Sequence, residues 1–119
     1  MPQSILIVEN DPHWHQILSE ISKKLGYTTC QVGLARDALN LVRSTDIALI
    51  LLDIKLPTIQ GHLLLSYLRK NKIVIPVIVV AGYLSPEVVE TLIDFEVHEI
   101  IIKSQFRVRR LADAIASAL

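Results

Sequence analysis

Residues 47–57 read Ile-Ala-Leu-Ile-Leu-Leu-Asp-Ile-Lys-Leu-Pro, so that six apolar residues end abruptly in the carboxylate of Asp53. A continuous apolar run of this length is typical of a strand that is buried on both faces, as strands of parallel sheets are. In open α/β sheets, ligands bind and chemistry takes place at the carboxyl ends of the strands. Asp53 is therefore the first candidate for a functional residue, and a purely structural role at the end of the strand is the alternative.

Short apolar segments alternate with segments of helical spacing along the whole chain. Strands are expected at 5–8, 27–32, 47–53, 77–80 and 99–102, and helices at 12–25, 34–43, 61–70, 86–95 and 107–118. Strands and helices that alternate through short loops favour parallel strand pairing with right-handed crossovers. The sequence therefore predicts an α/β fold, a doubly wound five-stranded parallel sheet in the order 2-1-3-4-5, with flavodoxin-like topology.

Length and composition narrow the class of protein. A chain of 119 residues that is 51% hydrophobic suffices for one domain, which we expect to span residues 1–119. Its 12 basic and 12 acidic side chains give no reason to expect direct binding of nucleic acid or of a membrane surface. The single cysteine, Cys30, excludes an intrachain disulfide. Without a signal peptide or an apolar run of ~20 residues, a cytoplasmic location is expected.

Three of the expected strands end in polar residues that the order 2-1-3-4-5 brings to one edge of the sheet. Glu9, Asn10 and Asp11 follow the first strand, Asp53 the third and Lys103 the fifth. Packed like charges raise one another's pKa unless a cation intervenes. Lys103 supplies one positive charge, and Mg²⁺, which binds a few carboxylates together with water and phosphate oxygens, would supply two more. Such a cluster suits an aspartyl nucleophile that accepts a phosphoryl group.

Proteins that bind a flavin share this topology and are the main alternative on fold grounds. A flavin phosphate needs a loop after the first strand that is rich in Gly, Ser or Thr, whose N–H and hydroxyl groups donate to it. Here residues 9–12 read Glu-Asn-Asp-Pro, which are anionic and lack one N–H. This loop would repel a phosphate in the absence of a cation, so flavin binding is disfavoured.

Taken together, these segments resemble a CheY-like response-regulator receiver domain of two-component signalling, over essentially the whole chain. The segments that carry the resemblance are 5–11, 51–57 with Gly61, and 100–103. The resemblance implies a signalling module and not an enzyme, in which Asp53 accepts phosphate from the phosphohistidine of a histidine kinase or phosphotransfer protein. It implies that Lys103 pairs with the phosphoryl group. It also implies that Mg²⁺ is bound by Asp53, by Glu9 and the amide oxygen of Asn10 in the first loop, and by the backbone carbonyl of Lys55.

The sequence departs from the family pattern in four places. Asn10 stands where the family has the second of two acids, so the affinity for Mg²⁺ should fall. Ala81 replaces a Thr or Ser whose hydroxyl grips the phosphoryl group, although the backbone N–H of Gly82 remains a possible donor. Ile100 replaces the aromatic side chain that acts as a switch. Ser104 replaces a cis-proline, and because a cis bond before a non-proline costs ~3–4 kcal/mol, we predict a trans peptide there.

Two hypotheses follow. The first is a phosphoacceptor receiver with unusual switching, favoured by Asp53, Glu9 and Lys103. The second is a pseudo-receiver that docks a partner whether or not Asp53 is phosphorylated, favoured by the residues at the switch positions and by Asn10. The resemblance places a homodimer or output partner on the face made by segments 86–95, 99–102 and 107–118. Trp14 follows the acidic loop closely, so its fluorescence should report whether Mg²⁺ binds.

Overall fold

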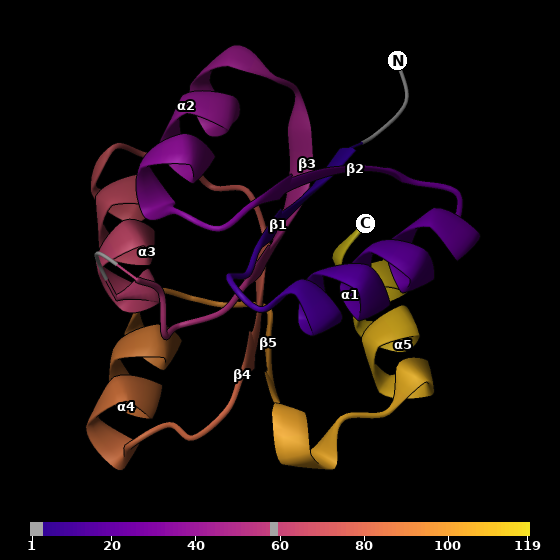
Figure 1. Ribbon diagram of the computed structural model, residues 1–119. Coiled ribbons are helices and arrows are strands. Elements are labelled where there is room, and N and C mark those ends of the chain that lie inside the picture. Colours follow the sequence, from indigo (N-terminus) through magenta and orange to yellow (C-terminus); the bar gives the residue numbers. More distant parts are fainter. Residues whose placement is uncertain (1–3, 58–59) are drawn as a thin grey trace.

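The computed structural model describes residues 4–57 and 60–119, and its strands and helices alternate along the chain (Figure 1). In order, the elements are β1 (Ser4–Val8), α1 (Pro12–Lys24), β2 (Thr28–Val32), α2 (Ala35–Ser44), β3 (Ile47–Leu52), α3 (Gly61–Lys70), β4 (Val77–Ala81), α4 (Pro86–Asp94), β5 (Glu99–Ile102), the 3₁₀ helix η1 (Lys103–Gln105) and α5 (Val108–Ala118).

The five strands form one parallel sheet in the order β2-β1-β3-β4-β5, which confirms the predicted fold and strand order. The register aligns β1 with β3 at their carboxyl ends, whereas β4 and β5 extend past Leu52. Val8 pairs with Leu52, Leu52 with Val79, and Ala81 with Ile102. Each of these strands therefore delivers the residues that follow it to the same edge of the sheet.

Side chains alternate between the two faces of the sheet, and each face has its own apolar core. One core lies under α1 and α5 and includes Ile5, Ile7, Leu49, Leu51, Ile78, Val80, Ile101 and Leu111. The other lies under α2, α3 and α4 and includes Leu6, Val8, Ile50, Leu52, Val77, Val79, Leu64 and Leu92. Figure 1 shows the same division, with α1 and α5 on one side of the sheet and the other three helices opposite. Burial on both faces explains why the central strands are continuously apolar.

The first and fourth helices begin as the sequence predicts. Asp11 caps α1 by accepting a hydrogen bond from the backbone N–H of His13 at 2.8 Å, and Pro12 is the first helical residue. Ser85 caps α4 in the same way, at 3.3 Å from the N–H of Val88. The carboxylate of Asp11 is therefore engaged at the start of α1.

Several element ends differ from the predicted ones by one residue. The second strand begins at Thr28, the second helix begins at Ala35, and the fifth helix begins at Val108. Leu25 falls within the helix predicted over 12–25, but it is 41% exposed because α1 ends before it. Val108 is 60% exposed at the first turn of α5, where the helix extends past the core.

The segment after β5 takes a form that the strand and helix pattern did not predict. Lys103 begins η1, a single 3₁₀ turn in which its carbonyl accepts the N–H of Phe106 at 3.2 Å. Throughout the described ranges 4–57 and 60–119 there is no cis peptide bond, which confirms the trans bond predicted before Ser104. The turn absorbs the change of direction between β5 and α5.

Gly61 brings the start of α3 directly against the end of β3. Its N–H donates to the carbonyl of Ile54 at 2.6 Å. A Cβ at this position would collide with the backbone carbonyl of Asp53 and lie 2.9 Å from Ile54 Cα. Because both are backbone atoms, the clash cannot be relieved by a side-chain rotation.

We therefore expect Gly61→Ala to lower the free energy of unfolding by about 1–3 kcal/mol, as overpacking does. Gly82→Ala is the matched control, because a Cβ there meets no atom within 4 Å. It should change stability by no more than about 1 kcal/mol. Urea unfolding of the two variants measures the difference, and an equal effect would contradict the close approach at Gly61.

Candidate functional site

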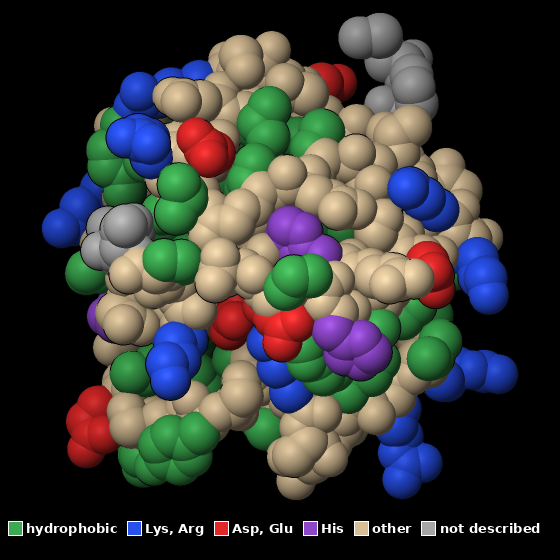
Figure 2. All heavy atoms as spheres, in the orientation of Figure 1, with side chains coloured by type: hydrophobic (Ala, Val, Ile, Leu, Met, Phe, Trp, Pro, Cys, Tyr) green, Lys and Arg blue, Asp and Glu red, His purple; other side chains and the backbone are tan. Residues whose placement is uncertain are grey.

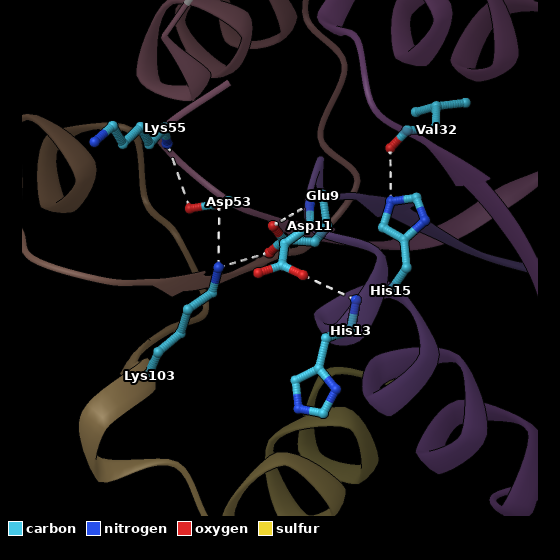
Figure 3. A network of polar contacts seen from close by, with 8 residues as sticks. All are labelled: Glu9, Asp11, His13, His15, Val32, Asp53, Lys55 and Lys103. Carbon is cyan, nitrogen blue, oxygen red and sulfur yellow. Dashed lines mark hydrogen bonds and ion pairs between the residues drawn. The ribbon is translucent and has the colours of Figure 1, made fainter. Parts of the chain in front are cut away.

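Asp53 lies immediately after β3 with only 7% of its surface exposed. Its backbone N–H continues the sheet by donating to the carbonyl of Val8 at 2.9 Å. One carboxylate oxygen, Oδ1, accepts the backbone N–H of Lys55 at 3.3 Å, and Oδ2 lies 3.3 Å from Lys103 Nζ (Figure 3). The carboxylate is thus held in place from two sides by weak, long contacts.

Glu9 follows β1 and is 1% exposed. Its Oε1 accepts the backbone N–H of Asp11 at 3.1 Å. Its Oε2 lies 2.9 Å from Lys103 Nζ and forms an ion pair with it, drawn as a dashed line in Figure 3. Burial raises the pKa of Glu9, and the Lys103 ammonium opposes that rise only in part.

Lys103 follows β5, which is an edge strand of the sheet, and its ammonium contacts both carboxylates. Its side chain is 17% exposed, and burial by itself would lower its pKa. The contact with Glu9 and the attraction of Asp53 outweigh burial, so the pKa of Lys103 is raised. Lys103 is therefore charged at neutral pH. With both carboxylates ionised, the three side chains carry one net negative charge.

The net negative charge of Glu9, Asp53 and Lys103 favours the binding of a divalent cation. Two buried carboxylates with free lone pairs, next to solvent, are the kind of oxygen donors that Mg²⁺ uses together with water. Glu9 and Asp53 share a surface pocket with Asn10 and Lys55. Within the described residues, no group of three or more His, Cys, Asp or Glu side chains is placed to hold a metal. The donors present thus fit Mg²⁺. Glu9 and Asp53 supply two buried carboxylates, whereas Asp11, which also lines the pocket, caps α1 through its Oδ1.

Asn10 lines this pocket next to the turn that follows β2. A Cβ built on Gly33 would lie 3.2 Å from Asn10 Oδ1, so the amide oxygen is close to the turn that follows β2. That turn lies on the side of β1 away from β3. Asn10 and Asp53 nevertheless line the same pocket.

The predicted switch positions separate into two groups. Ala81 and Gly82 line a pocket of about 540 Å³ together with Asp53, Lys55 and Lys103. Ala81 is buried at the end of β4, whereas Gly82 is exposed. The half-buried Ile100 instead packs into the core under α2, α3 and α4 and is not among the residues described around this pocket.

Two contacts of the site were not expected from the sequence. The backbone N–H of Lys55 reaches Asp53, and Lys103 Nζ lies 5.2 Å from the centre of the Trp14 ring. From the sequence, Trp14 is expected close to the acidic loop, but its contact with Lys103 is not predicted. The contact could have been predicted from the position of Trp14, which comes three residues after Asp11 on the first turn of the helix that follows β1.

The surface beside the site carries both signs of charge. In Figure 2, red acidic side chains gather near the centre of the face, with a blue basic side chain directly against them. Farther away, Arg110 Nε lies 3.3 Å from Glu99 Oε2, and both side chains are partly exposed. Within residues 4–57 and 60–119, no helix has both the length and the apolar character needed to cross a membrane.

Removal of the Lys103 charge tests the electrostatic description. Lys103→Met leaves two buried carboxylates without their ammonium, and we expect it to lower the free energy of unfolding by about 1–3 kcal/mol at pH 7. This is less than the cost at a fully buried site because water partly screens the ammonium. Lys55→Met, on an exposed side chain of the same pocket, should change stability by no more than about 0.5 kcal/mol. Equal losses in urea unfolding would mean that Lys103 does not stabilise the cluster.

Comparison with known proteins agrees with this geometry. The family model described as "Response regulator receiver domain" matches residues 5–116. The polar-differentiation response regulator DivK of Brucella anthropi is 32% identical over 85 residues, which cover 70% of this chain and 69% of DivK. The two-component response regulator ARR11 of Arabidopsis thaliana is 35% identical over 65 residues, which cover 53% of this chain and only 12% of ARR11.

Among solved structures, the response regulator TrrA of Thermotoga maritima, in complex with Mg²⁺–BeF, is 26% identical with a TM-score of 0.85. The match covers 98% of this chain and 99% of TrrA. The sheet order, the convergence of Glu9, Asp53 and Lys103 at the strand ends, and the match over residues 5–116 agree with one another. The chain belongs to the family of response regulator receiver domains of two-component signalling.

Proposed function

We propose that residues 1–119 act as a receiver domain that accepts a phosphoryl group on Asp53 from a histidine kinase or phosphotransfer protein. The observation that carries this proposal is the placement of the Asp53 carboxylate. It is fixed at the end of β3 between the Lys55 N–H and the Lys103 ammonium, and Glu9 shares that ammonium. A purely structural aspartate at the end of a strand would not require a second buried carboxylate that shares the same ammonium.

The transfer is a displacement at phosphorus. A carboxylate oxygen of Asp53 attacks the phosphorus of a phosphohistidine from the side opposite the imidazole. The new O–P bond forms as the P–N bond breaks, and the electron pair returns to the imidazole nitrogen. The product is an acyl phosphate on Asp53 and a histidine free to take up a proton. Lys103 neutralises charge on the phosphoryl oxygens, and the Lys55 N–H fixes the attacking carboxylate.

In this proposal Glu9, Asp53 and the backbone carbonyl of Lys55 hold Mg²⁺. When bound, the ion supplies two positive charges that offset the carboxylates and the phosphoryl oxygens. The Mg²⁺–BeF complex of TrrA supports this choice of metal by similarity. Asn10 adds no charge, so the affinity should lie below that of a site with three carboxylates.

We further propose that switching is atypical. Ala81 has no hydroxyl to hold the phosphoryl group, which leaves the Gly82 N–H as the donor at the end of β4. Ile100 is an aliphatic side chain packed in the core against α4, and it has no ring to rotate between two positions. A ligand shifts an equilibrium only as far as its contacts differ between the two states. Phosphorylation should therefore change the α4–β5–α5 face, proposed as the site of a homodimer or output partner, only weakly.

The direct test of the acceptor is the intact mass after incubation with acetyl phosphate and Mg²⁺. Here the P–O bond to acetate breaks in place of the P–N bond, and acetate leaves. We expect the gain of one phosphoryl group in the wild type and none in Asp53→Asn. A gain that persists in Asp53→Asn would assign the acceptor to another residue. No gain at all, with Mg²⁺ bound, would instead favour a docking module that works without phosphorylation.

The effect of Asn10 on the metal can be measured separately. Trp14, the single tryptophan, lies against Lys103, so its fluorescence should change when Mg²⁺ enters the pocket. Because Asn10→Asp adds a carboxylate to the ligands proposed for Mg²⁺, we expect this variant to bind the ion about tenfold more tightly, or about 1.4 kcal/mol. The prediction is falsified if the wild type binds Mg²⁺ as tightly as this variant. Asn40→Asp, an exposed site on α2, controls for the change in net charge.

A further inference from the structure

The indole of Trp14 forms one side of the space that holds the Lys103 ammonium. Lys103 Nζ lies 5.2 Å from the ring centroid, within the range of a cation–π contact. On its other side the same ammonium meets Glu9 Oε2 at 2.9 Å and Asp53 Oδ2 at 3.3 Å. Two anions and an aromatic ring therefore contact one flexible side chain.

The ring itself is held in place by a second aromatic side chain. Phe106 packs edge-on against Trp14, with ring centroids 5.0 Å apart and planes at 82°. Phe106 reaches this position because η1 turns the chain after Lys103 back towards α1. Trp14 and Phe106 both pack against the core under α1 and α5. The residue that carries the charge and the residue that fixes the ring are thus three positions apart on one turn.

This arrangement restricts a side chain that is otherwise mobile. A lysine side chain has four rotatable bonds, so it loses considerable rotamer entropy when it is fixed. Its contacts with Asp53 and Glu9 give it charge partners, but a point charge can satisfy them in many geometries. The face of the indole limits these geometries, and the capped start of α1 fixes the backbone that carries it.

We propose that Trp14 is a positioning residue for Lys103 and thereby sets the rate at which Asp53 gains its phosphoryl group, a role that rests on the proposed phosphorylation of Asp53. Trp14 does not touch the phosphoryl group. It holds the ammonium where that group's oxygens arrive. The Trp14 ring does this from α1, on the face of the sheet opposite to the core that contains Ala81 and Ile100.

A simple packing role for Trp14 makes different predictions. If the indole only fills the core, its loss should lower stability by the same factor whether or not position 103 carries a charge. If the indole positions the ammonium, the two substitutions must interact. The size of this coupling separates the two roles, and it does not depend on phosphorylation.

The experiment uses Trp14→Phe, Trp14→Leu, Lys103→Met and the double variant Trp14→Leu/Lys103→Met. We expect Trp14→Leu to slow phosphorylation by acetyl phosphate on the order of fivefold to tenfold, and Trp14→Phe, which keeps an aromatic face, to slow it by no more than about threefold. Tyr27→Leu removes another ring from the same core, directly before β2 and therefore at the edge of the sheet opposite to the site. It should lower stability and leave the rate unchanged.

In urea unfolding, the double variant should be more stable than the sum of the two single effects predicts, on the order of fivefold in the unfolding equilibrium constant. Additive effects, or equal rates for folded Trp14→Leu and the wild type, would overturn the assignment. If the wild type gains no phosphoryl group, the proposed function fails. The coupling in unfolding then decides by itself whether Trp14 positions Lys103.

Discussion

The ammonium of Lys103, shared by two buried carboxylates, is the interaction on which the functional edge of this protein depends. Glu9 follows β1, Asp53 follows β3 and Lys103 follows β5, so one cation joins three strands that lie apart in the chain. β4 separates β3 from β5, and the long stem of Lys103 crosses its end. Removal of the cation would leave two like charges buried together, which explains why the strand ends and their charges must be considered as one unit.

The residues that neutralise charge at Asp53 and the residues proposed to transmit the switch lie on opposite faces of the sheet. Lys103 lies against Trp14, which packs over the core under α1 and α5. Ala81 and Ile100 belong to the core under α2, α3 and α4. Charge neutralisation at Asp53 is therefore supported from one side of the sheet. The positions proposed to transmit the change lie on the other, where a hydroxyl and an aromatic ring are both missing.

Much of the fold and of the charged cluster could be predicted from the sequence because both follow from short-range rules. The apolar run before Asp53 predicts a buried strand, and the strand order then brings Glu9 and Lys103 to the same edge. The rest depends on how side chains turn in space. No spacing rule shows that the Asn10 amide is turned towards Gly33, or that η1 returns Phe106 to Trp14. These contacts join residues that are 23 and 92 positions apart in the chain, and they arise only once the sheet has formed.

The most direct test of the shared cation is a double-mutant cycle in urea unfolding with Glu9→Gln, Lys103→Met and the double variant, at neutral pH and low salt. If the ammonium compensates the buried carboxylate, loss of both groups should cost less than the sum of the single losses, with a coupling energy of about 1–3 kcal/mol. The coupling should persist at 0.5 M NaCl, because a buried pair is screened less than an exposed one. A coupling near zero would contradict the account, since Glu9 and Lys103 would then be neighbours without a significant interaction.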